Sequence, residues 1–339
     1  MDPRTDWKED VAADEDERFE RLAQRLAAMQ KARPGAPTRA LHGKSHAGLR
    51  ARLRVLADLP PHARQGLFVE PRERRAYVRL SNGAGAALPD RGPDLRGLAI
   101  KVLDVDGPKV LGEARTQDFL MIDSPTVPFA SPDEFVAFVT ATAEPKGAIG
   151  KVVRELGVRR TLGLLAGLVR TAKGKPRGVL DRTFYSATPV SFGPYAARYA
   201  AFPLHAASDE PAATPERDYL RTRTSARVKR GPLEYELRAQ FFEGDGTPIE
   251  DSRVDWRSPF VPVARLTIEA QDAGSPQGVR LGTFIETLSF DPWHALVEHR
   301  PLGSVMRARK HAYYASIQAR SAAPEPDGSE WASFDAAPA

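Results

Sequence analysis

The most informative absence in this sequence is cysteine. None of the 339 residues is a cysteine, which excludes disulfide bonds, thiolate nucleophiles and cysteine-ligated metal centres. Long apolar runs are absent as well, since the longest, residues 161–169, falls far short of the roughly 20 residues that span a bilayer. The acidic N-terminal stretch has no apolar signal core. These absences predict a cytoplasmic protein without a membrane span.

A large excess of charge of one sign is also missing. The chain has 49 Lys and Arg against 44 Asp and Glu, a net charge of +5 that is spread along the sequence. Such a balance allows attraction to anionic ligands but does not predict a nucleic-acid partner. The hydrophobic content of 42% is typical of a globular protein that buries a substantial core.

Common catalytic and nucleotide motifs are lacking. The sequence contains no GxGxxG, GxxxxGK[ST], HExxH or GxSxG segment. The glycine-rich residues 81–89 lack a lysine and a following helix, so they do not favour phosphate binding. His42 and His46 have the i, i+4 spacing of a helical metal pair, but Gly43 and Gly48 argue against a helix there.

Hydrophobic periodicity outlines an α+β chain. Helical spacing predicts helices over 15–31, from Ser131 onward, and over 147–172 and 307–320. Strand-like alternation marks 66–81, 97–105, 116–123, 233–241, 261–270 and 282–290. We therefore expect an N-terminal helical arm and linker (1–38), a main domain built on an antiparallel barrel or sandwich (39–320) and a disordered tail (321–339).

The predicted helix over 307–320, RARKHAYYASIQAR, places two adjacent tyrosines among cations. One explanation is an exposed basic helix with tyrosines packed on its inner face. The other is a tyrosinate that needs a neighbouring cation. Arg309 lies one helical turn before Tyr313 on the same face, whereas Tyr314 points about 100° away. A free tyrosine has a pKa near ~10, and a metal and a guanidinium would favour its ionised form.

Three segments, in this order, resemble elements of the catalases. They are RALHGK (39–44), VRLS (78–81) followed by DLRGLAIK (94–101), and the spacing of Arg309, Tyr313 and Arg320. Residues 290–309 are similar to those of the short, catalase-related haem proteins in particular. The resemblance covers most of 39–320 and implies a minimal catalase-like antiparallel β-barrel with inserted and C-terminal helices.

The same resemblance implies a haem b cofactor with Tyr313 as the axial ligand of its iron. Arg309 would support the phenolate, and an anionic oxygen ligand would keep the iron ferric. The two haem propionates need cations when they are buried, and the family pattern assigns that role to Arg39, Arg79 and Arg320. Phe129 is expected to pack against the haem.

On the opposite haem face, the resemblance implies that His42 transfers a proton between the two peroxide oxygens. Ser81 would hydrogen-bond the ring and fix its tautomer. One departure concerns an Asn–Thr–Pro segment of the catalases, which here reads Arg115–Thr116–Gln117. Arg115 would either polarise the O–O bond or point outward, and loss of the Asn puts dismutation of hydrogen peroxide in doubt.

The resulting expectation is a haem peroxidase or catalase-like oxidoreductase. It would reduce hydrogen peroxide or organic hydroperoxides through a ferryl intermediate, with a small organic electron donor. A fatty-acid hydroperoxide isomerase or dehydratase and a non-catalytic haem-binding protein are the alternatives. The N-terminal arm suggests a homo-oligomer.

Overall fold

A computed structural model describes residues 3–35, 38–92, 94–143, 147–172, 178–204 and 216–334. In the described part, nine strands form one antiparallel sheet in the order β5-β4-β3-β2-β1-β9-β8-β7-β6. An additional pairing of β5 with β7 closes this sheet into a ring of eight strands, and β6 attaches to β7 outside it. The strands are β1 (Ser45–Val55), β2 (Glu73–Asn82), β3 (Arg96–Val102), β4 (Gln117–Ile122), β5 (Phe184–Tyr185), β6 (Val190–Phe192), β7 (Tyr195–Pro203), β8 (Leu233–Phe241) and β9 (Phe260–Ile268).

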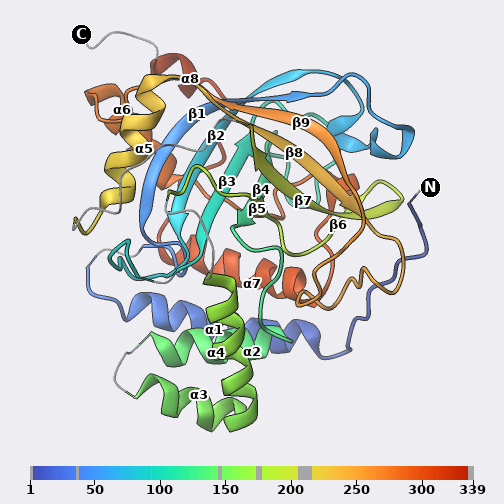
Figure 1. The fold of residues 1–339 in the computed structure, drawn as a ribbon, viewed down its shortest axis with the longest axis vertical. Helices are drawn as coiled ribbons and strands as arrows, with labels where there is room; N and C mark the ends of the chain where they lie inside the picture. The colour runs from blue at the N-terminus through green and yellow to red at the C-terminus, as the bar shows by residue number, and fades with distance from the viewer. Residues whose placement is uncertain are drawn as a thin grey trace.

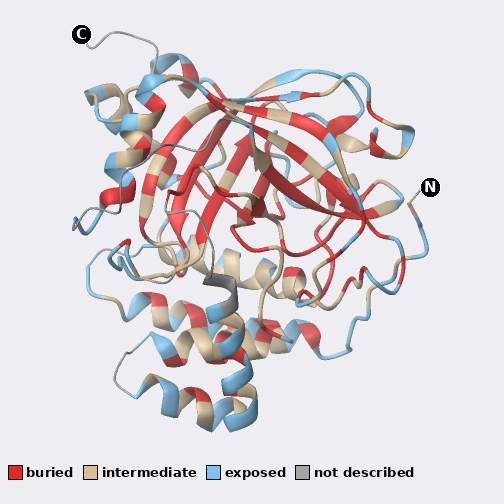
Figure 2. Cartoon of the chain, viewed as in Figure 1, coloured by how far each residue is buried: buried red, intermediate tan, exposed pale blue. Residues whose placement is uncertain are grey.

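Strand β8 illustrates why these segments form the barrel. Its residues alternate between buried and partly exposed along most of the strand, because successive side chains of a strand point to opposite faces. The inward side chains from the eight strands merge into one apolar cluster that fills the barrel, and most of the length of the barrel strands is buried (Figure 2). His299 lies within it, accepting from the Leu67 amide at 3.0 Å and contacting the Tyr199 hydroxyl at 3.2 Å. The interior is thus a packed core.

The helices form two groups around the barrel (Figure 1). One group, below the barrel in this view, comprises α1 (Glu15–Lys31), α2 (Pro132–Thr142), α3 (Ala148–Leu156), α4 (Val158–Ala172) and α7 (Ser304–Ala319). The other lies beside β1 and comprises α5 (Tyr219–Arg230), α6 (Pro276–Thr287) and α8 (Glu330–Ser333). Short 3₁₀ turns occupy Pro61–Ala63, Gly66–Phe68 and Val297–His299.

The N-terminal arm packs on the rest of the chain. Helix α1 has the predicted bounds, and Phe19, Leu22 and Leu26 on its apolar face are buried against Ala308 and Ala312 of α7. The face that suggested self-association is therefore covered within the same chain. Residues 36–37 of the predicted linker lie outside the described residues.

Two strand predictions differ from the structure. The segment 282–290 was expected to be a strand, but residues up to Thr287 belong to α6. The hydroxyl of Ser275 caps this helix by accepting from the Gly278 amide, and proline occupies the first turn. In the segment 66–81, only the second half is a strand, since Gly66–Phe68 is a 3₁₀ turn. Strands β1 and β7 were not predicted.

The prediction of a disordered tail is wrong for residues 321–334. Trp331 of α8 is buried against the ring of Tyr77, at 5.4 Å between centroids. Further along the barrel wall, Glu325 reaches Lys101 and accepts from the Thr116 hydroxyl at 2.8 Å. One aromatic and one carboxylate therefore attach a segment of low overall hydrophobicity. Residues 335–339 lie outside the described residues.

No helix in the described part of the chain is both long enough and apolar enough to cross a membrane.

Candidate functional site

His42 sits in a loop just before β1 and has an unusual backbone conformation. Its φ is +54°, in the left-handed region that non-glycine residues seldom adopt. The conformation is held by the glycine-rich segment 81–89: His42 N donates to the Gly83 carbonyl at 2.9 Å, and Gly43 N donates to the Ala84 carbonyl at 3.0 Å. This glycine-rich segment thus supports His42 through its carbonyl oxygens, consistent with its lack of a phosphate-binding motif.

The His42 ring is oriented by the barrel wall. Its Nδ1 lies 3.0 Å from the hydroxyl of Ser81, on β2. Ser81 pairs across the sheet with Gly97 of β3, and a Cβ added at Gly97 would lie 2.6 Å from His42 Nδ1 and 2.8 Å from Ser81 Oγ. Glycine at position 97 is therefore what lets the ring and the hydroxyl meet. The structure thus places His42 and Ser81 in contact, and their catalytic roles stay a prediction.

The surroundings of His42 keep its ring neutral. Burial, followed by the charges of Arg79, Arg309 and Arg39, lowers its pKa to about 3. The side chain nevertheless retains accessible surface. In the described part of the chain, Nε2 has no hydrogen-bond partner. A half-buried neutral imidazole with one oriented nitrogen and one free nitrogen is suited to accept a proton.

Tyr313 and Arg309 form the second part of the site, on α7. Arg309 Nη2 donates to the Tyr313 hydroxyl at 2.9 Å, as predicted from their spacing of one helical turn. Tyr314 is 66% exposed and points away. Met306 is the only fully buried residue of α7, although the helix lies between the barrel and α1 (Figures 1 and 2). The face that carries Arg309 and Tyr313 is thus incompletely covered by protein.

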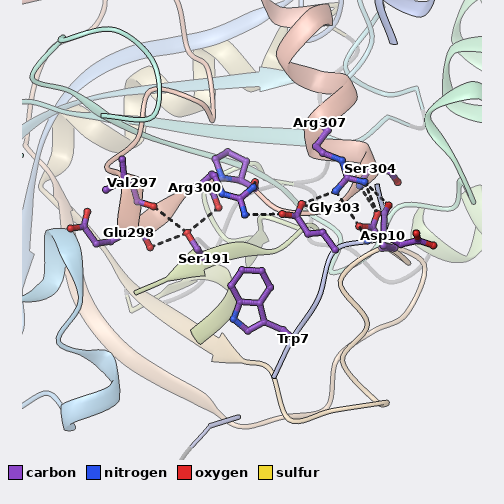
Figure 3. Close-up of polar contacts among 12 residues, drawn as sticks. Trp7, Asp10, Ser191, Val297, Glu298, Arg300, Gly303, Ser304 and Arg307 are labelled. Atoms are coloured by element: carbon purple, nitrogen blue, oxygen red, sulfur yellow. Dashed lines mark hydrogen bonds and ion pairs between the residues drawn. The ribbon is translucent and has the colours of Figure 1, made fainter. Parts of the chain in front are cut away.

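The start of α7 is firmly anchored, which fixes the position of Tyr313. Gly303 N donates to Glu9 at 2.9 Å and Ser304 N donates to Glu250 at 2.6 Å. Arg307 of the first turn pairs with Glu15 and with both of these carboxylates. Arg307 also donates to the Asp10 carbonyl at 2.9 Å (Figure 3). Carboxylates at a helix N-terminus satisfy its free amide groups and its dipole. This network joins the N-terminal arm to α7.

Three arginines from separate elements gather at the C-terminal end of α6, and two of them pair with the Glu286 carboxylate. Arg39 Nη1 lies 2.9 Å from Glu286 Oε2, and Arg79 Nε lies 2.7 Å from Glu286 Oε1. Arg320, at the end of α7, donates to the Leu288 carbonyl at 2.8 Å, and Arg39 donates to the same carbonyl at 2.7 Å. Arg79 also donates to the His42 carbonyl at 2.9 Å, so this arginine cluster adjoins the His42 loop.

Positive charge exceeds negative charge in this cluster. Burial, together with the neighbouring Arg79, lowers the pKa of Arg39 to about 9. Burial and Arg79 also lower the pKa of Arg320. Burial alone would raise the pKa of Glu286, but Arg79 and Arg39 outweigh that effect and hold it below its usual value. Two guanidiniums pair with this carboxylate and the third, Arg320, donates only to backbone carbonyls beside it in the described part of the chain, so the cluster has positive charge to spare for further anionic groups.

The structure does not bring every expected residue to the site. Arg115 is exposed and pairs with Asp106 at 2.7 Å, on the barrel surface, so the expectation that it polarises a substrate is not supported. Phe129 is buried near the start of α2 against the rings of Phe135 and Phe138, and its contact with a haem stays a prediction.

Two cavities of about 380 and 370 Å³ open along other faces of α7. Lys310 and His311 line both of them, whereas His42 and Tyr313 line neither. These cavities are therefore separate from the candidate site.

Two contributors to the site were missed from sequence. Glu286 escaped notice because its segment was assigned to a strand, which hid its position at the C-terminal end of α6 facing two arginines. Gly97 lies within the quoted family segment, but its steric role depends on the strand register with Ser81. Neither contact has a signal in the local sequence.

Comparisons with known proteins bear on the fold. No protein-family model and no curated protein matches the chain at the level of sequence. Solved structures that are similar to it include two catalases. A bacterial catalase aligns with a TM-score of 0.65 at 16% identity, over 91% of this chain and 62% of that one. Catalase A from Saccharomyces cerevisiae aligns with a TM-score of 0.64 at 14% identity, over 98% of this chain and 70% of that one.

This chain thus spans 62% of the length of the bacterial catalase. At such identities the likeness establishes architecture, not activity. The predicted fold class is confirmed: the closed ring of antiparallel strands, with helices inserted and appended, is a catalase-like fold.

Proposed function

We propose that this chain binds haem b between His42 and Tyr313 and reduces hydrogen peroxide or organic hydroperoxides, with electrons from a small organic donor. The observation that carries the proposal is the hydrogen bond from Arg309 to the Tyr313 hydroxyl at 2.9 Å. A cation one helical turn before a tyrosine would support a phenolate ligand, and an anionic oxygen ligand stabilises ferric haem iron. The catalase-like fold supports the same assignment.

The donor set suits a haem. Tyr313 would ligate the iron, and Arg309 would stabilise its phenolate. Arg39, Arg79 and Arg320 would hold the two propionates, because their combined charge exceeds that of Glu286, the carboxylate that pairs with Arg39 and Arg79. The half-buried face of α7 offers surface that a flat macrocycle could cover. Residues from the His42 loop, β2 and α7 would thus hold the group together.

His42 is proposed as the proton carrier. When bound, haem supplies a redox-active iron at which the O–O bond of a peroxide is broken. The neutral ring of His42 would take a proton from the peroxide at Nε2 and return it to the departing oxygen. For Nε2 to accept a proton, the single N–H proton of the neutral ring must be on Nδ1, which then donates it in a hydrogen bond to the Ser81 hydroxyl. Ser81 would therefore set the tautomer.

The exposed position of Arg115 favours a peroxidase over an efficient dismutase. The sequence lacks the Asn that helps to hold the peroxide in the family pattern. Arg115 does not take its place, because it pairs with Asp106 on the surface. Peroxide handling would rest mainly on His42.

An absorption titration with haem tests the proposal. We expect a stoichiometric complex whose Soret band changes on addition of peroxide. Tyr313→Phe should abolish stable binding or shift the Soret band strongly, whereas the matched Tyr314→Phe, at an exposed position of the same helix, should behave as wild type. Equal spectra for Tyr313→Phe and wild type would contradict the proposal. Product analysis with hydrogen peroxide and with a fatty-acid hydroperoxide then separates reduction from isomerisation.

A further inference from the structure

Helix α4 carries an exposed apolar stripe that the proposed function does not use. Val158 and Leu162 are each 62% exposed, and Val169 is 61% exposed. Because an α-helix turns by about 100° per residue, the side chains at positions 158, 162 and 169 lie within about 40° of one another around the helix axis. A row of branched aliphatic side chains in water is unfavourable unless another surface covers it.

This stripe is not the face that fastens α4 to the rest of the protein. Thr161 and Leu164 are buried, and a Cβ at Gly167 would contact Pro128 at 3.3 Å. Arg160 pairs with Glu134 of α2. Helix α4 is therefore held by one side, and the exposure of the stripe means that no described part of the chain covers it.

The surrounding sequence is strongly basic. Residues 148–177 contain eight Lys or Arg and one acidic residue, Glu155. That single carboxylate is already paired with Arg25 of α1 at 3.0 Å. Arg154 and Arg159 are exposed on α3 and α4. The entire chain has a net charge of only +5, so more positive charge is concentrated here than the molecule carries overall.

The position of this segment makes it accessible. Helices α3 and α4 form a hairpin at the end of the molecule farthest from the upper rim of the barrel (Figure 1), and much of its surface is exposed (Figure 2). Ile149 of α3 adds another exposed apolar side chain, also 62% exposed. A flat partner could reach the hairpin without contacting the barrel.

We propose that the α3–α4 hairpin is a docking surface for anionic phospholipid bilayers. An amphipathic helix with an apolar stripe and basic flanks lies in the plane of the lipid interface, with aliphatic side chains among the acyl chains and cations at the phosphates. A second copy of this chain fits the surface less well. A twofold contact between two such hairpins would bring their excess positive charges together.

Vesicle co-sedimentation of the full chain tests the proposal. We expect binding to vesicles of phosphatidylcholine mixed with phosphatidylglycerol, little binding to phosphatidylcholine alone, and release by high salt. Leu162→Glu should weaken the association by at least about tenfold, since it places a carboxylate within the inserted stripe. The matched control is Val279→Glu, at a 55% exposed valine of α6, which should bind within about twofold of wild type.

Charge is tested separately with Arg159→Glu, which should reduce binding to the anionic vesicles by about fivefold or more. Circular dichroism melting verifies that all variants are folded. Equal binding by wild type and Leu162→Glu would overturn the proposal, as would binding that ignores lipid charge. A wild-type dimer that ignores vesicles and becomes monomeric in Leu162→Glu would show that a second copy covers the stripe, and would overturn it too.

Discussion

At the scale of single residues, His42 depends on neighbours that immobilise both its backbone and its ring. Carbonyl oxygens of the glycine-rich segment accept hydrogen bonds from the His42 loop, and Arg79 donates a hydrogen bond to the carbonyl of His42. The hydroxyl of Ser81 contacts Nδ1 of the His42 ring. The cost of a left-handed φ at a non-glycine residue is of the order of 1–3 kcal/mol. Such strain is retained where the surrounding structure over-determines the conformation, which supports a functional role for this side chain.

Replacement of His42 by alanine should separate haem binding from reaction. We expect His42→Ala to bind haem with near wild-type affinity, because it contributes no proposed iron or propionate contact. The rate of reaction with peroxide should fall by about 10²–10⁴, the usual contribution of a general acid–base group. Stopped-flow absorption measures this rate. Arg115→Ala is the control and should react as wild type, since its side chain lies on the surface. A wild-type rate in His42→Ala would remove it from the mechanism.

Glu286 offers a second test at this scale. Its carboxylate pairs with Arg39 and Arg79, the cations proposed for the propionates. Glu286→Gln should therefore tighten haem binding by about fivefold, since removing one negative charge near the bound propionates would contribute on the order of 1 kcal/mol. The haem-free variant should be less stable, because Arg79 would be buried without its counter-charge. Haem titration and urea unfolding give the two values. Weaker haem binding would indicate that Glu286 instead pre-orients the arginines.

Two kinds of information in the sequence predicted part of the site: local helix geometry and the resemblance to a family. Arg309 and Tyr313 are separated by one helical turn, so their contact follows from helix periodicity alone. His42 and Ser81 are far apart in sequence, and only the family pattern connected them. Arg115 takes the outward one of the two orientations that the sequence left open, because a position in a motif does not determine which way a side chain points. Glu286 required knowledge of the tertiary contact between α6 and the His42 loop.

At the scale of elements, α6 shows how alternation misleads. GTFIETLSF, residues 282–290, alternates well enough to suggest a strand, but Leu281, Ile285 and Leu288 are buried at helical spacing. The helix cap at Ser275 lies seven residues before this segment, so the segment itself contains no signal for the start of a helix. Strand β7 was missed for another reason: four of its nine residues are alanine, which has low strand propensity, and pairing with β8 overrides that preference.

The tail is the element whose role is most testable. Glu325 contacts Lys101, which is fully buried and also pairs with Asp118 at 2.8 Å. Burial would lower the pKa of Lys101, but these two carboxylates outweigh it and raise the pKa. Glu325→Gln should lower the free energy of unfolding by about 2 kcal/mol, because one partner of a buried ammonium is lost while the other remains.

Urea unfolding measures this effect, and Asp327→Asn provides the control. Asp327 is an exposed acid of the same tail, and its replacement should change stability by less than about 0.5 kcal/mol. If both variants had wild-type stability, the tail would not contribute to the packing of the barrel wall.

At the scale of the whole molecule, the candidate site lies where two structural layers meet. The barrel wall supplies Arg79 and Ser81, and the loop before β1 supplies Arg39 and His42. Helix α7, positioned by the N-terminal arm through Arg307, supplies the tyrosine. The antiparallel barrel was predictable from alternation and resemblance, whereas its closure through the two-residue strand β5 was not. Any change that shifts the arm should therefore affect the tyrosine side of the site before the histidine side.

Acid should destabilise the haem-free protein through its buried histidines. Burial lowers the pKa of His42 to about 3 and that of His299 to about 4, and it lowers the pKa of His46 as well. In the unfolded chain these groups titrate near ~6.5, so between the two pKa values the unfolded state binds more protons. The stabilisation is therefore complete above pH ~6.5 and is lost as the pH falls below it.

At pH 5 the loss should be about 2 kcal/mol for each of His42 and His299. Asp291 opposes it, because burial raises its pKa to about 6 and so favours the folded state in acid. Asp94, whose pKa burial raises, opposes it as well, and so does His294, where burial would lower the pKa but Asp118 outweighs it and raises the pKa. Urea midpoints between pH 7.5 and 5 should nevertheless fall, since the pKa values of His42, His299 and His46 are strongly lowered. His299→Gln should be less stable at neutral pH but should lose about 2 kcal/mol less than wild type on acidification. A midpoint that is constant or rises from pH 7.5 to 5 would mean that these imidazoles are not buried as neutral groups.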